Sequence, residues 1–433
     1  MFIIHITEED GGKKMLTWNP ATGLFGGLDH AVPDLPEDVT KYCQKYIEHE
    51  KKKRDVFSMR IALGDTCNLH CAYCIQSWKD RKSVPENDRL EELCDAILYF
   101  FERSGKQELA VDFMGGEPLL HFDTIKKIVC CLKGKKINVS FSFITNGVLF
   151  DGRKAEFCLE HGIGVTLSHD GPGQALRGID PLTPRSESYR AIQRFYRSRP
   201  DLFAVNPVLT KHNFNVEEIW GYIENRLHGK VRMSECLPCI PATEEIAETY
   251  SLTDMDDLTL FRDRVIHLAL TRHLDHFMTY TEIFCQIFDT TINHTPVPRR
   301  GRCRASGATP FVVDACDGNL RRCTSLNMDM MLSDHVQNGV GNIIELFRQG
   351  ASFADLEALM TEKPLDWTTR ENCRECPYIV GCMGGCPALP EELFELNCLQ
   401  NTMLGQALFG AFLKTLYPAM RDFRVEYVGD NVC

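Results

Sequence analysis

The feature that most constrains the fold is a regular alternation of short apolar runs and amphipathic helical patterns between residues 58 and 234. Runs of this length suit β-strands, and strands that alternate with helices indicate βαβ units around a parallel sheet. Six such units fall short of the eight that close a (β/α) barrel. We therefore expect an α/β fold with a partial (β/α)6 barrel similar to a TIM barrel. The expected strands are 58–63, 109–114, 139–144, 165–168, 203–208 and 231–234, and the expected helices are 89–103, 122–132, 154–160, 188–197 and 216–227.

The segments on either side of this alternation have a different texture. The first 57 residues predict a hairpin followed by a helix over 39–52, and another helical pattern covers 254–273. After about residue 290 a polar, proline-containing stretch suits a linker, and nine of the twenty cysteines lie beyond it. We expect three domains: a lead-in over 1–57, the barrel over 58–290, and a cysteine-rich domain over 291–433 that ends in an amphipathic helix.

The composition excludes several classes of protein. With 48 basic and 60 acidic residues the net charge is −12, which argues against a nucleic-acid backbone as the main partner. No apolar run reaches the ~18 residues of a membrane helix, and the acidic start differs from a signal peptide. Twenty cysteines in a large chain without such a signal indicate metal ligands or redox groups. We therefore expect a cytoplasmic protein with no membrane partner.

The sharpest motif is Cys67-x3-Cys71-x2-Cys74, in the loop after the first expected strand. Parallel α/β sheets carry their chemistry at this end of the strands. Three thiolates can hold three irons of a [4Fe–4S] cube and leave the fourth iron open. The alternative is a structural zinc site, but zinc normally takes four ligands from paired motifs, and no well-spaced fourth ligand follows nearby. The motif therefore favours an iron–sulfur cluster with one open position.

With Tyr73 before the third cysteine, this spacing resembles the radical SAM superfamily, in which the open iron binds S-adenosylmethionine (SAM). One electron then cleaves SAM to a 5′-deoxyadenosyl radical in that family. Two further segments, 115–118 and 168–172, resemble the family's GGEP and S-x-D-G-P motifs at the ends of the second and fourth expected strands. Paired glycines let the backbone approach a ligand closely. The resemblance implies SAM contacts from Tyr73, Gly115, Gly116, Glu117, Asn146, Ser168, Arg177 and Leu237.

The C-terminal cysteines resemble a second pattern, the seven-cysteine SPASM domain of peptide-modifying radical SAM enzymes. In that domain two auxiliary [4Fe–4S] clusters are bound. A pair of zinc knuckles is the alternative, because thiolate spacing alone does not exclude zinc. The resemblance implies an outer cluster on Cys373, Cys376, Cys382 and Cys398, and an inner cluster on Cys303, Cys323 and Cys386.

The inner cluster has one implied ligand fewer than a cube needs, and Cys316 is the only further cysteine between Cys303 and Cys323. The pattern over 311–323 predicts a hairpin with a two-residue Asp317-Gly318 turn, so that Cys316 would pair near Asn319. Whether its side chain then shares a face with Cys323 depends on the pleat, which the sequence leaves open. We hypothesise that Cys316 closes the inner cluster; a turn-flanking thiol with no ligand role is the alternative.

The resemblance covers about residues 58–400 and implies a peptide maturase. Such an enzyme abstracts hydrogen from a ribosomally made precursor peptide and couples the carbon radical to a neighbouring side chain through a C–C, C–S or C–O link. It implies SAM and three [4Fe–4S] clusters as cofactors, and a low-potential electron donor such as flavodoxin or ferredoxin as a partner. A strand of the lead-in could pair with an extended leader of the precursor.

Two alternatives differ in chemistry from this reading. The first is an anaerobic sulfatase-maturating, formylglycine-forming enzyme. Three positions argue against it. Such enzymes tend to carry an aromatic residue where this chain has Gln76, and Gln where it has Met114. They carry a catalytic Asp where this chain has Thr324. The second is a non-catalytic iron–sulfur electron carrier, which would need no SAM pocket. Separately, Cys236-x2-Cys239 after the last expected strand could be a redox pair or simply two buried thiols.

Overall fold

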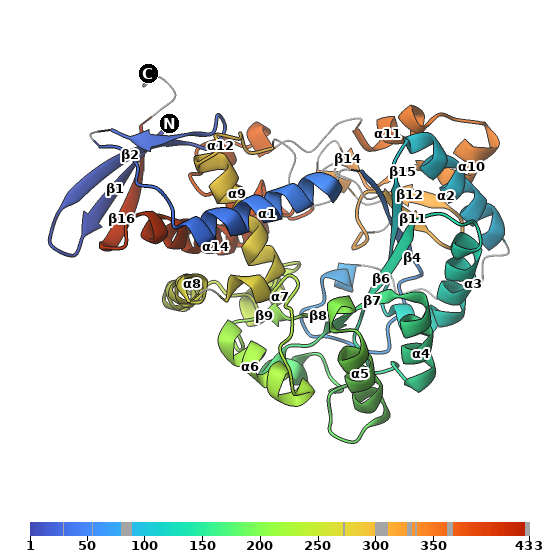
Figure 1. Ribbon diagram of the computed structural model, residues 1–433. Coiled ribbons are helices and arrows are strands. Elements are labelled where there is room, and N and C mark those ends of the chain that lie inside the picture. Colours follow the sequence, from blue (N-terminus) through green and yellow to red (C-terminus); the bar gives the residue numbers. More distant parts are fainter. Residues whose placement is uncertain are drawn as a thin grey trace.

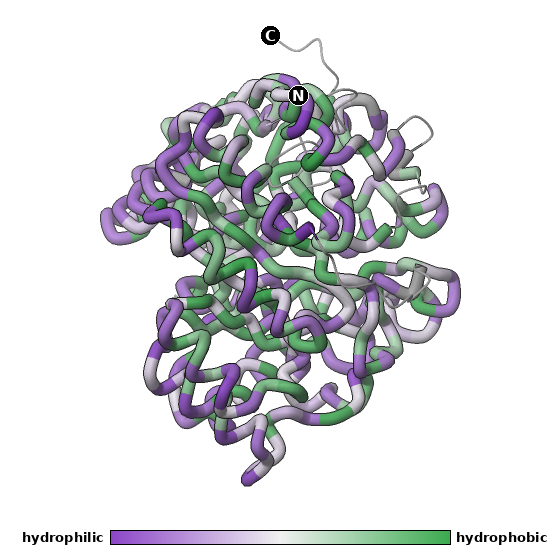
Figure 2. Tube along the Cα trace, turned by 90° about the vertical axis from the view of Figure 1, so that its right-hand side faces the viewer, coloured by the Kyte–Doolittle hydropathy of each residue, from purple (hydrophilic) through white to green (hydrophobic). Residues whose placement is uncertain are grey.

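The computed structural model describes residues 1–28, 30–53, 55–78, 89–271, 273–298, 311–326, 331–333, 336–361 and 367–428 (Figure 1). One large apolar core connects an N-terminal sheet, a central sheet and a group of C-terminal helices. Figure 2 shows hydrophobic residues along the inner segments of the chain and hydrophilic residues along many of the outer ones. Within the described part of the chain, no helix combines the length and hydropathy that crossing a membrane requires.

The central sheet has eight strands in the order β15-β12-β11-β4-β5-β6-β7-β8, and its five neighbouring pairs from β11 to β8 are parallel. Buried residues alternate with half-buried ones along β5, as expected for a strand with one face against helices. The bounds are β4 (Val56–Ala62), β5 (Glu108–Met114), β6 (Val139–Thr145), β7 (Ile163–Ser168), β8 (Phe203–Asn206), β11 (Phe311–Asp314), β12 (Asn319–Arg321) and β15 (Gly339–Asn342).

Helices connect the parallel strands and cover the outer side of the sheet (Figure 1). Asp151, Ser186 and Asn215 cap three of them by accepting a backbone N–H of the first turn. The partial barrel is confirmed, and the five expected helices begin and end within two residues of their predicted bounds. They are α2 (Leu90–Ser104), α3 (Phe122–Lys133), α4 (Gly152–His161), α5 (Glu187–Ser198) and α6 (Val216–Leu227).

The prediction of a sixth strand over residues 231–234 is wrong. Of this segment only Met233 makes β-bridges, to Val205 and to Phe277. Cys236 has a left-handed backbone, with φ 49°, which ends the extended conformation before a ladder can form. A two-stranded parallel sheet of β9 (Val208–Leu209) and β10 (Leu237–Pro238) follows instead. The additional parallel strand of the central sheet is β11, which pairs with β4.

The N-terminal segment forms more than the expected hairpin and helix. Its strands β1 (Phe2–Glu8), β2 (Lys13–Asn19) and β3 (Leu24–Gly27) form an antiparallel sheet with β16 (Met420–Tyr427), in the order β16-β1-β2-β3. The helix is α1 (Glu37–Lys53). Trp18 of β2 is fully buried, and its ring centre lies 5.4 Å from that of Phe409. Its Nε1–H donates to the Pro377 carbonyl at 2.8 Å. The two ends of the sequence are therefore held together in one sheet.

A long helix, α14 (Glu391–Leu416), lies near the C-terminus and packs against α8 (Met255–Leu270) and α9 (Met278–Thr291). The expected linker falls between α9 and β11, where residues 299–310 lie outside the described part. The strands β11, β12 and β15, from the expected cysteine-rich domain, join the sheet of the barrel. The remaining elements are α7 (Glu244–Thr249), β13 (Met331–Ser333), β14 (Val336–Gln337), α10 (Ile343–Arg348), α11 (Phe353–Thr361), α12 (Glu371–Arg374) and α13 (Ile379–Cys382).

The hairpin of β11 and β12 forms, but its expected register is wrong by two residues. Val312 pairs with Arg321 and Val313 with Leu320, which centres the loop on Cys316 and Asp317. The Asp317 carboxylate accepts the Asn319 N–H at 2.9 Å, and the Gly318 N–H bonds the Asp314 carbonyl at 2.9 Å. These local bonds favour a wider turn than the two-residue type. Cys316 therefore lies in the loop and not opposite Asn319.

Candidate functional site

The three cysteines of the sharpest motif lie together in the loop after β4, at the carboxyl end of the parallel strands. Burial raises the pKa of the Cys71 thiol to about 11; the Arg177 guanidinium opposes this, while Cys74 and Cys67 add to it. The Cys67 sulfur accepts the Leu69 N–H at 3.4 Å. A loop of three neighbouring thiols with donors directed at sulfur is a suitable donor set for an iron–sulfur cube.

The glycine motif after β5 packs directly against this loop. The Gly116 N–H donates to the Gly64 carbonyl and the Glu117 N–H to the Thr66 carbonyl, both at 2.9 Å. A Cβ added at Gly116 would lie 2.3 Å from the Thr66 oxygen, and one at Gly115 would lie 2.6 Å from the Gly64 oxygen. Both positions need glycine because two backbones touch here, which is a structural reason independent of any ligand.

Glu117 is buried under this junction and holds the next strand end. Its carboxylate accepts the Thr145 hydroxyl at 2.6 Å and the backbone N–H groups of Asn146 at 2.8 Å and Leu119 at 3.0 Å. Burial raises the pKa of Glu117, although these three donors oppose the shift. The Asn146 amide in turn donates to the Asn68 side chain at 2.8 Å. The predicted residues 115–117 and Asn146 therefore lie next to the cysteine loop and are hydrogen-bonded to it.

The remaining predicted SAM contacts lie around the ends of β7 and β8. Ser168 is the last residue of β7 and pairs with Asn206. Arg177 follows a short helical turn, η3 (Gly171–Leu176), and its guanidinium lies 5.6 Å from the centre of the Tyr73 ring. Leu237 in β10 pairs with Val208 of β9. The structure thus places every predicted SAM contact at the carboxyl end of the sheet.

The C-terminal cysteines form two groups. Burial raises the pKa of Cys376 to about 12, and the thiols of Cys382, Cys398 and Cys373 add to this, so these four lie near one another. In the second group burial raises the pKa of Cys386 to about 11, with a further contribution from Cys323. The division of these cysteines between an outer and an inner cluster stays a prediction. Cys303 lies outside the described residues.

Cys316 is half-buried in the β11–β12 loop, and its surroundings are acidic. Burial raises the pKa of its thiol to about 12, and the neighbouring carboxylates Asp317 and Asp314 add to this. Its role as a cluster ligand stays a prediction.

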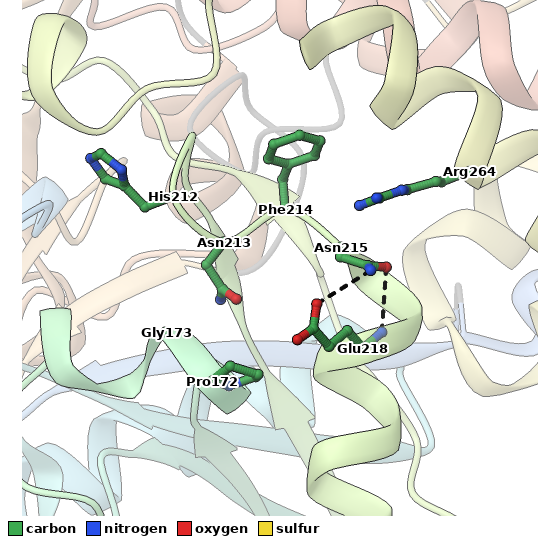
Figure 3. Close-up of a pocket in the computed structure, with 8 residues that line it drawn as sticks. All are labelled: Pro172, Gly173, His212, Asn213, Phe214, Asn215, Glu218 and Arg264. Atoms are coloured by element: carbon green, nitrogen blue, oxygen red, sulfur yellow. Dashed lines mark hydrogen bonds between the residues drawn. The ribbon is translucent and has the colours of Figure 1, made fainter.

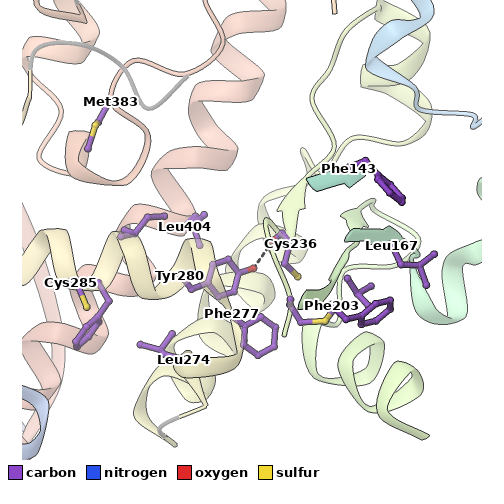
Figure 4. Close-up of a cluster of buried hydrophobic side chains, with 14 of the residues drawn as sticks. Phe143, Leu167, Phe203, Cys236, Leu274, Phe277, Tyr280, Cys285, Met383 and Leu404 are labelled. Carbon is purple, nitrogen blue, oxygen red and sulfur yellow. Dashed lines mark hydrogen bonds between the residues drawn. The ribbon is translucent and has the colours of Figure 1, made fainter. Parts of the chain in front are cut away.

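Cys236 and Cys239 are buried thiols, one of the two alternatives given for this pair, and the sequence did not show what they pack against. Both are buried, and the Cys236 carbonyl accepts the hydroxyl of the buried Tyr280 at 2.8 Å (Figure 4). Cys239 packs in a small apolar cluster with Tyr73, Ala242 and Ile246, beside the cysteine loop. Its carbonyl accepts the Gln400 amide of α14 at 3.3 Å. This segment therefore joins the cysteine loop to the helix that carries Cys398.

An open pocket of about 310 Å³ lies beside the S-x-D-G-P turn and contains charges of both signs (Figure 3). The Arg264 guanidinium lies 5.5 Å from the centre of the Phe214 ring. Glu218 and Asn215 bond each other across the first turn of α6. The Asn213 amide donates to the Asp170 carbonyl at 2.7 Å, which connects the pocket wall to the turn. The lining residues are Pro172, Gly173, His212, Asn213, Phe214, Asn215, Glu218 and Arg264.

Comparison with known proteins assigns this arrangement to a class. Residues 61–224, which carry the cysteine loop, the glycine motif and the S-x-D-G-P motif, match the model of the radical SAM superfamily. This part of the chain therefore matches the radical SAM superfamily, and the resemblance noted for its cysteine and glycine motifs is confirmed. The residues present fit the cofactors of that class, because Cys67, Cys71 and Cys74 share one loop, and Cys74 and Cys67 both act on the pKa of the Cys71 thiol.

Three relatives indicate where the chain lies within this class. A radical SAM cyclopropyl synthase, TigE, from Paramaledivibacter caminithermalis is 24% identical over 196 residues, 40% of this chain and 41% of that protein. A cysteine-type anaerobic sulfatase-maturating enzyme from Clostridium perfringens is 24% identical over 355 residues, 76% of this chain and 90% of that protein. The solved structure of native anSMEcpe with bound AdoMet has the same fold, with a TM-score of 0.61 and 21% identity over 84% of this chain and 99% of that one.

Proposed function

We propose that this protein is a radical SAM peptide maturase that forms a side-chain cross-link in a ribosomally made precursor peptide. The observation that carries the proposal is the radical SAM match over residues 61–224, within which the cysteine loop and the glycine motif lie together at the carboxyl end of the parallel strands. We further propose that the cysteine-rich region is a SPASM domain with two auxiliary clusters, which gives three [4Fe–4S] clusters in all. The domain division at residues 57 and 290, a cytoplasmic location and a flavodoxin or ferredoxin as electron donor belong to the same proposal.

The chain's own residues would bind, position and shield the reacting groups. When bound, the cluster and SAM supply the radical that removes hydrogen from an unactivated carbon of the peptide. Cys67, Cys71 and Cys74 would hold the cluster, and the backbone at Gly115 and Gly116 would hold SAM beside it. The apolar cluster around Tyr73 and Cys239 would keep water away from this place.

The name of one relative supports the reaction class. The relative named as a cyclopropyl synthase makes a carbon ring according to its name, and closing a ring between two carbons removes two hydrogens. A cross-link between two side chains has the same hydrogen balance.

The second candidate is formylglycine formation, as in the anaerobic sulfatase-maturating relative that matches 76% of this chain. The length of that match favours it. Thr324, at the position where the catalytic Asp of such enzymes is expected, argues against it. Gln76, where an aromatic residue is expected, donates its amide to the Gly115 carbonyl at 3.0 Å and so belongs to the junction.

The deciding experiment is anoxic reconstitution with iron, sulfide, SAM and a reductant, followed by mass spectrometry of candidate peptides. Candidates are a short precursor encoded beside this chain and a sulfatase-type Cys peptide. A product lighter by two hydrogens supports cross-linking. Formylglycine from Cys exchanges a thiol for an aldehyde and gives a much larger mass loss. An unchanged mass with solvent deuterium uptake indicates epimerisation and refutes both candidates, and zinc without iron refutes radical SAM chemistry.

A further inference from the structure

Asp170, in the S-x-D-G-P turn, is a buried charge with several partners near the cysteine loop. It is 1% exposed. Its Oδ2 accepts the hydroxyl of Tyr73, which precedes the third cysteine of the loop. Its Oδ1 forms an ion pair with the Arg177 Nε at 3.0 Å and accepts the Val208 N–H at 2.9 Å. One carboxylate therefore joins the cysteine loop, the η3 turn and β9.

The backbone of Asp170 is held as firmly as its side chain. Its N–H donates to the Gln174 side chain at 3.1 Å, and its carbonyl accepts the Asn213 amide at 2.7 Å. These bonds hold the backbone of Asp170 independently of the contacts that its carboxylate makes with Tyr73 and Arg177. A buried carboxylate with both oxygens hydrogen-bonded is a rigid acceptor, and the groups that bond to it are held in fixed positions as well.

We propose that Asp170 is a positioning residue that fixes the third cysteine of the loop and the Arg177 guanidinium relative to each other. Tyr73 carries the constraint to the adjacent Cys74, and the ion pair carries it to Arg177, whose charge also acts on the Cys71 thiol. This inference rests on the proposed radical SAM function only in that Arg177 is taken to face SAM. It assigns to Asp170 a role toward the loop that does not require contact with SAM.

The test compares two variants with a matched control. Asp170→Asn keeps the shape but removes the charge, and Tyr73→Phe removes only the hydroxyl. The control is Asp180→Asn, because Asp180 lies near the same strand end and bonds His169 at 2.9 Å and the Leu182 N–H at 2.7 Å, and neither partner is in the cysteine loop. The wild type and all variants are prepared as full chains with reconstituted iron.

The first readout is hydrogen exchange of the peptides that cover residues 67–76, measured without SAM. Losing a hydrogen bond to a charged group costs roughly 1.5–3 kcal/mol, so exchange in the loop should rise about tenfold or more in both variants and stay within about twofold in the control. This readout does not depend on SAM cleavage, so it tests the inference even if the proposed function fails. Unchanged exchange in Tyr73→Phe would overturn the inference, even if Asp170→Asn failed to fold.

The second readout separates positioning from general stability. Loss of a group that orients ligands typically costs about 10–100-fold, so the KM for SAM should rise by that factor while iron content stays near the wild-type value. The Tyr73→Phe/Asp170→Asn double variant should be no worse than Asp170→Asn alone within about twofold, because both changes break one bond. Fully additive effects, or an equal KM rise in Asp180→Asn, would refute a role for Asp170 in positioning.

Discussion

Replacing Gly116 with Ala should separate the glycine motif from the cysteine loop. The added Cβ would lie 2.3 Å from the Thr66 oxygen and 2.6 Å from the Asp65 oxygen, both of them backbone atoms that cannot rotate away. Ordinary contact needs about 3.4 Å, so one backbone must move by about 1 Å. That movement breaks or stretches the two hydrogen bonds of 2.9 Å that join the segments.

The expected cost follows from those two bonds. A net ~0.5–1.5 kcal/mol for each gives a loss of about 1–3 kcal/mol in the free energy of unfolding. At about 2–4 °C per kcal/mol for a unit of this size, the melting temperature of the barrel should fall by several degrees. A displacement of about 1 Å at reacting groups can cost about a hundredfold in rate, so SAM cleavage should fall much more than stability does.

The matched control is Gly221→Ala in α6. A Cβ at Gly221 meets no atom within 4 Å, so this change should stabilise the helix by ~0.5–1 kcal/mol and leave SAM cleavage unchanged. Melting temperature and anoxic SAM cleavage are measured for both variants. If Gly116→Ala keeps the wild-type melting temperature and cleavage rate, the close backbone contact does not exist and the argument for the junction is lost.

The other predictions concern the cysteines and the N-terminal sheet. Changing Cys67, Cys71 and Cys74 together to Ala should remove about a third of some twelve irons and abolish SAM cleavage; loss of all iron, or retained cleavage, would contradict separate sites. Cys316→Ala should open an iron of the inner cluster, so that added thiol changes the electron paramagnetic resonance spectrum of the variant only; an unchanged spectrum rejects ligation. Trp18→Ala should lower stability by about 3–5 kcal/mol, because a fully buried indole bonded to the Pro377 carbonyl is lost; calorimetry showing a change below about 1 kcal/mol would refute this.

The barrel and its motifs were predictable because their signals are local. Each strand of the alternation is a short apolar run, and the cysteine and glycine motifs fall at strand ends that the pattern locates within two or three residues. The failed strand, 231–234, shows the limit: its apolar residues are buried, but the left-handed backbone at Cys236 comes from tertiary packing under Tyr280. No hydropathy pattern contains that information.

Long-range pairing was the part that the sequence did not disclose. Nothing in residues 420–427 indicates that they pair with residues 2–8, since strand partners are chosen by packing. The predicted hairpin register was wrong by two residues because the Asp317 carboxylate accepts the Asn319 N–H, a bond that the rule for two-residue turns does not include. Asp170 was visible within its motif, but its role depends on contacts with Tyr73 and Val208, which are distant in sequence.

The N-terminal sheet also sets an order of folding during synthesis. Glu8 of β1 pairs with Met420 of β16, 412 positions later in the chain. At ~5–20 residues per second, a ribosome needs roughly 20–80 s to make the intervening segment. Until then β1 has only β2 as a neighbour, and its other edge remains available to foreign strands. The barrel strands β4 to β8 are synthesised much earlier, so they can pair with one another before the N-terminal sheet can close.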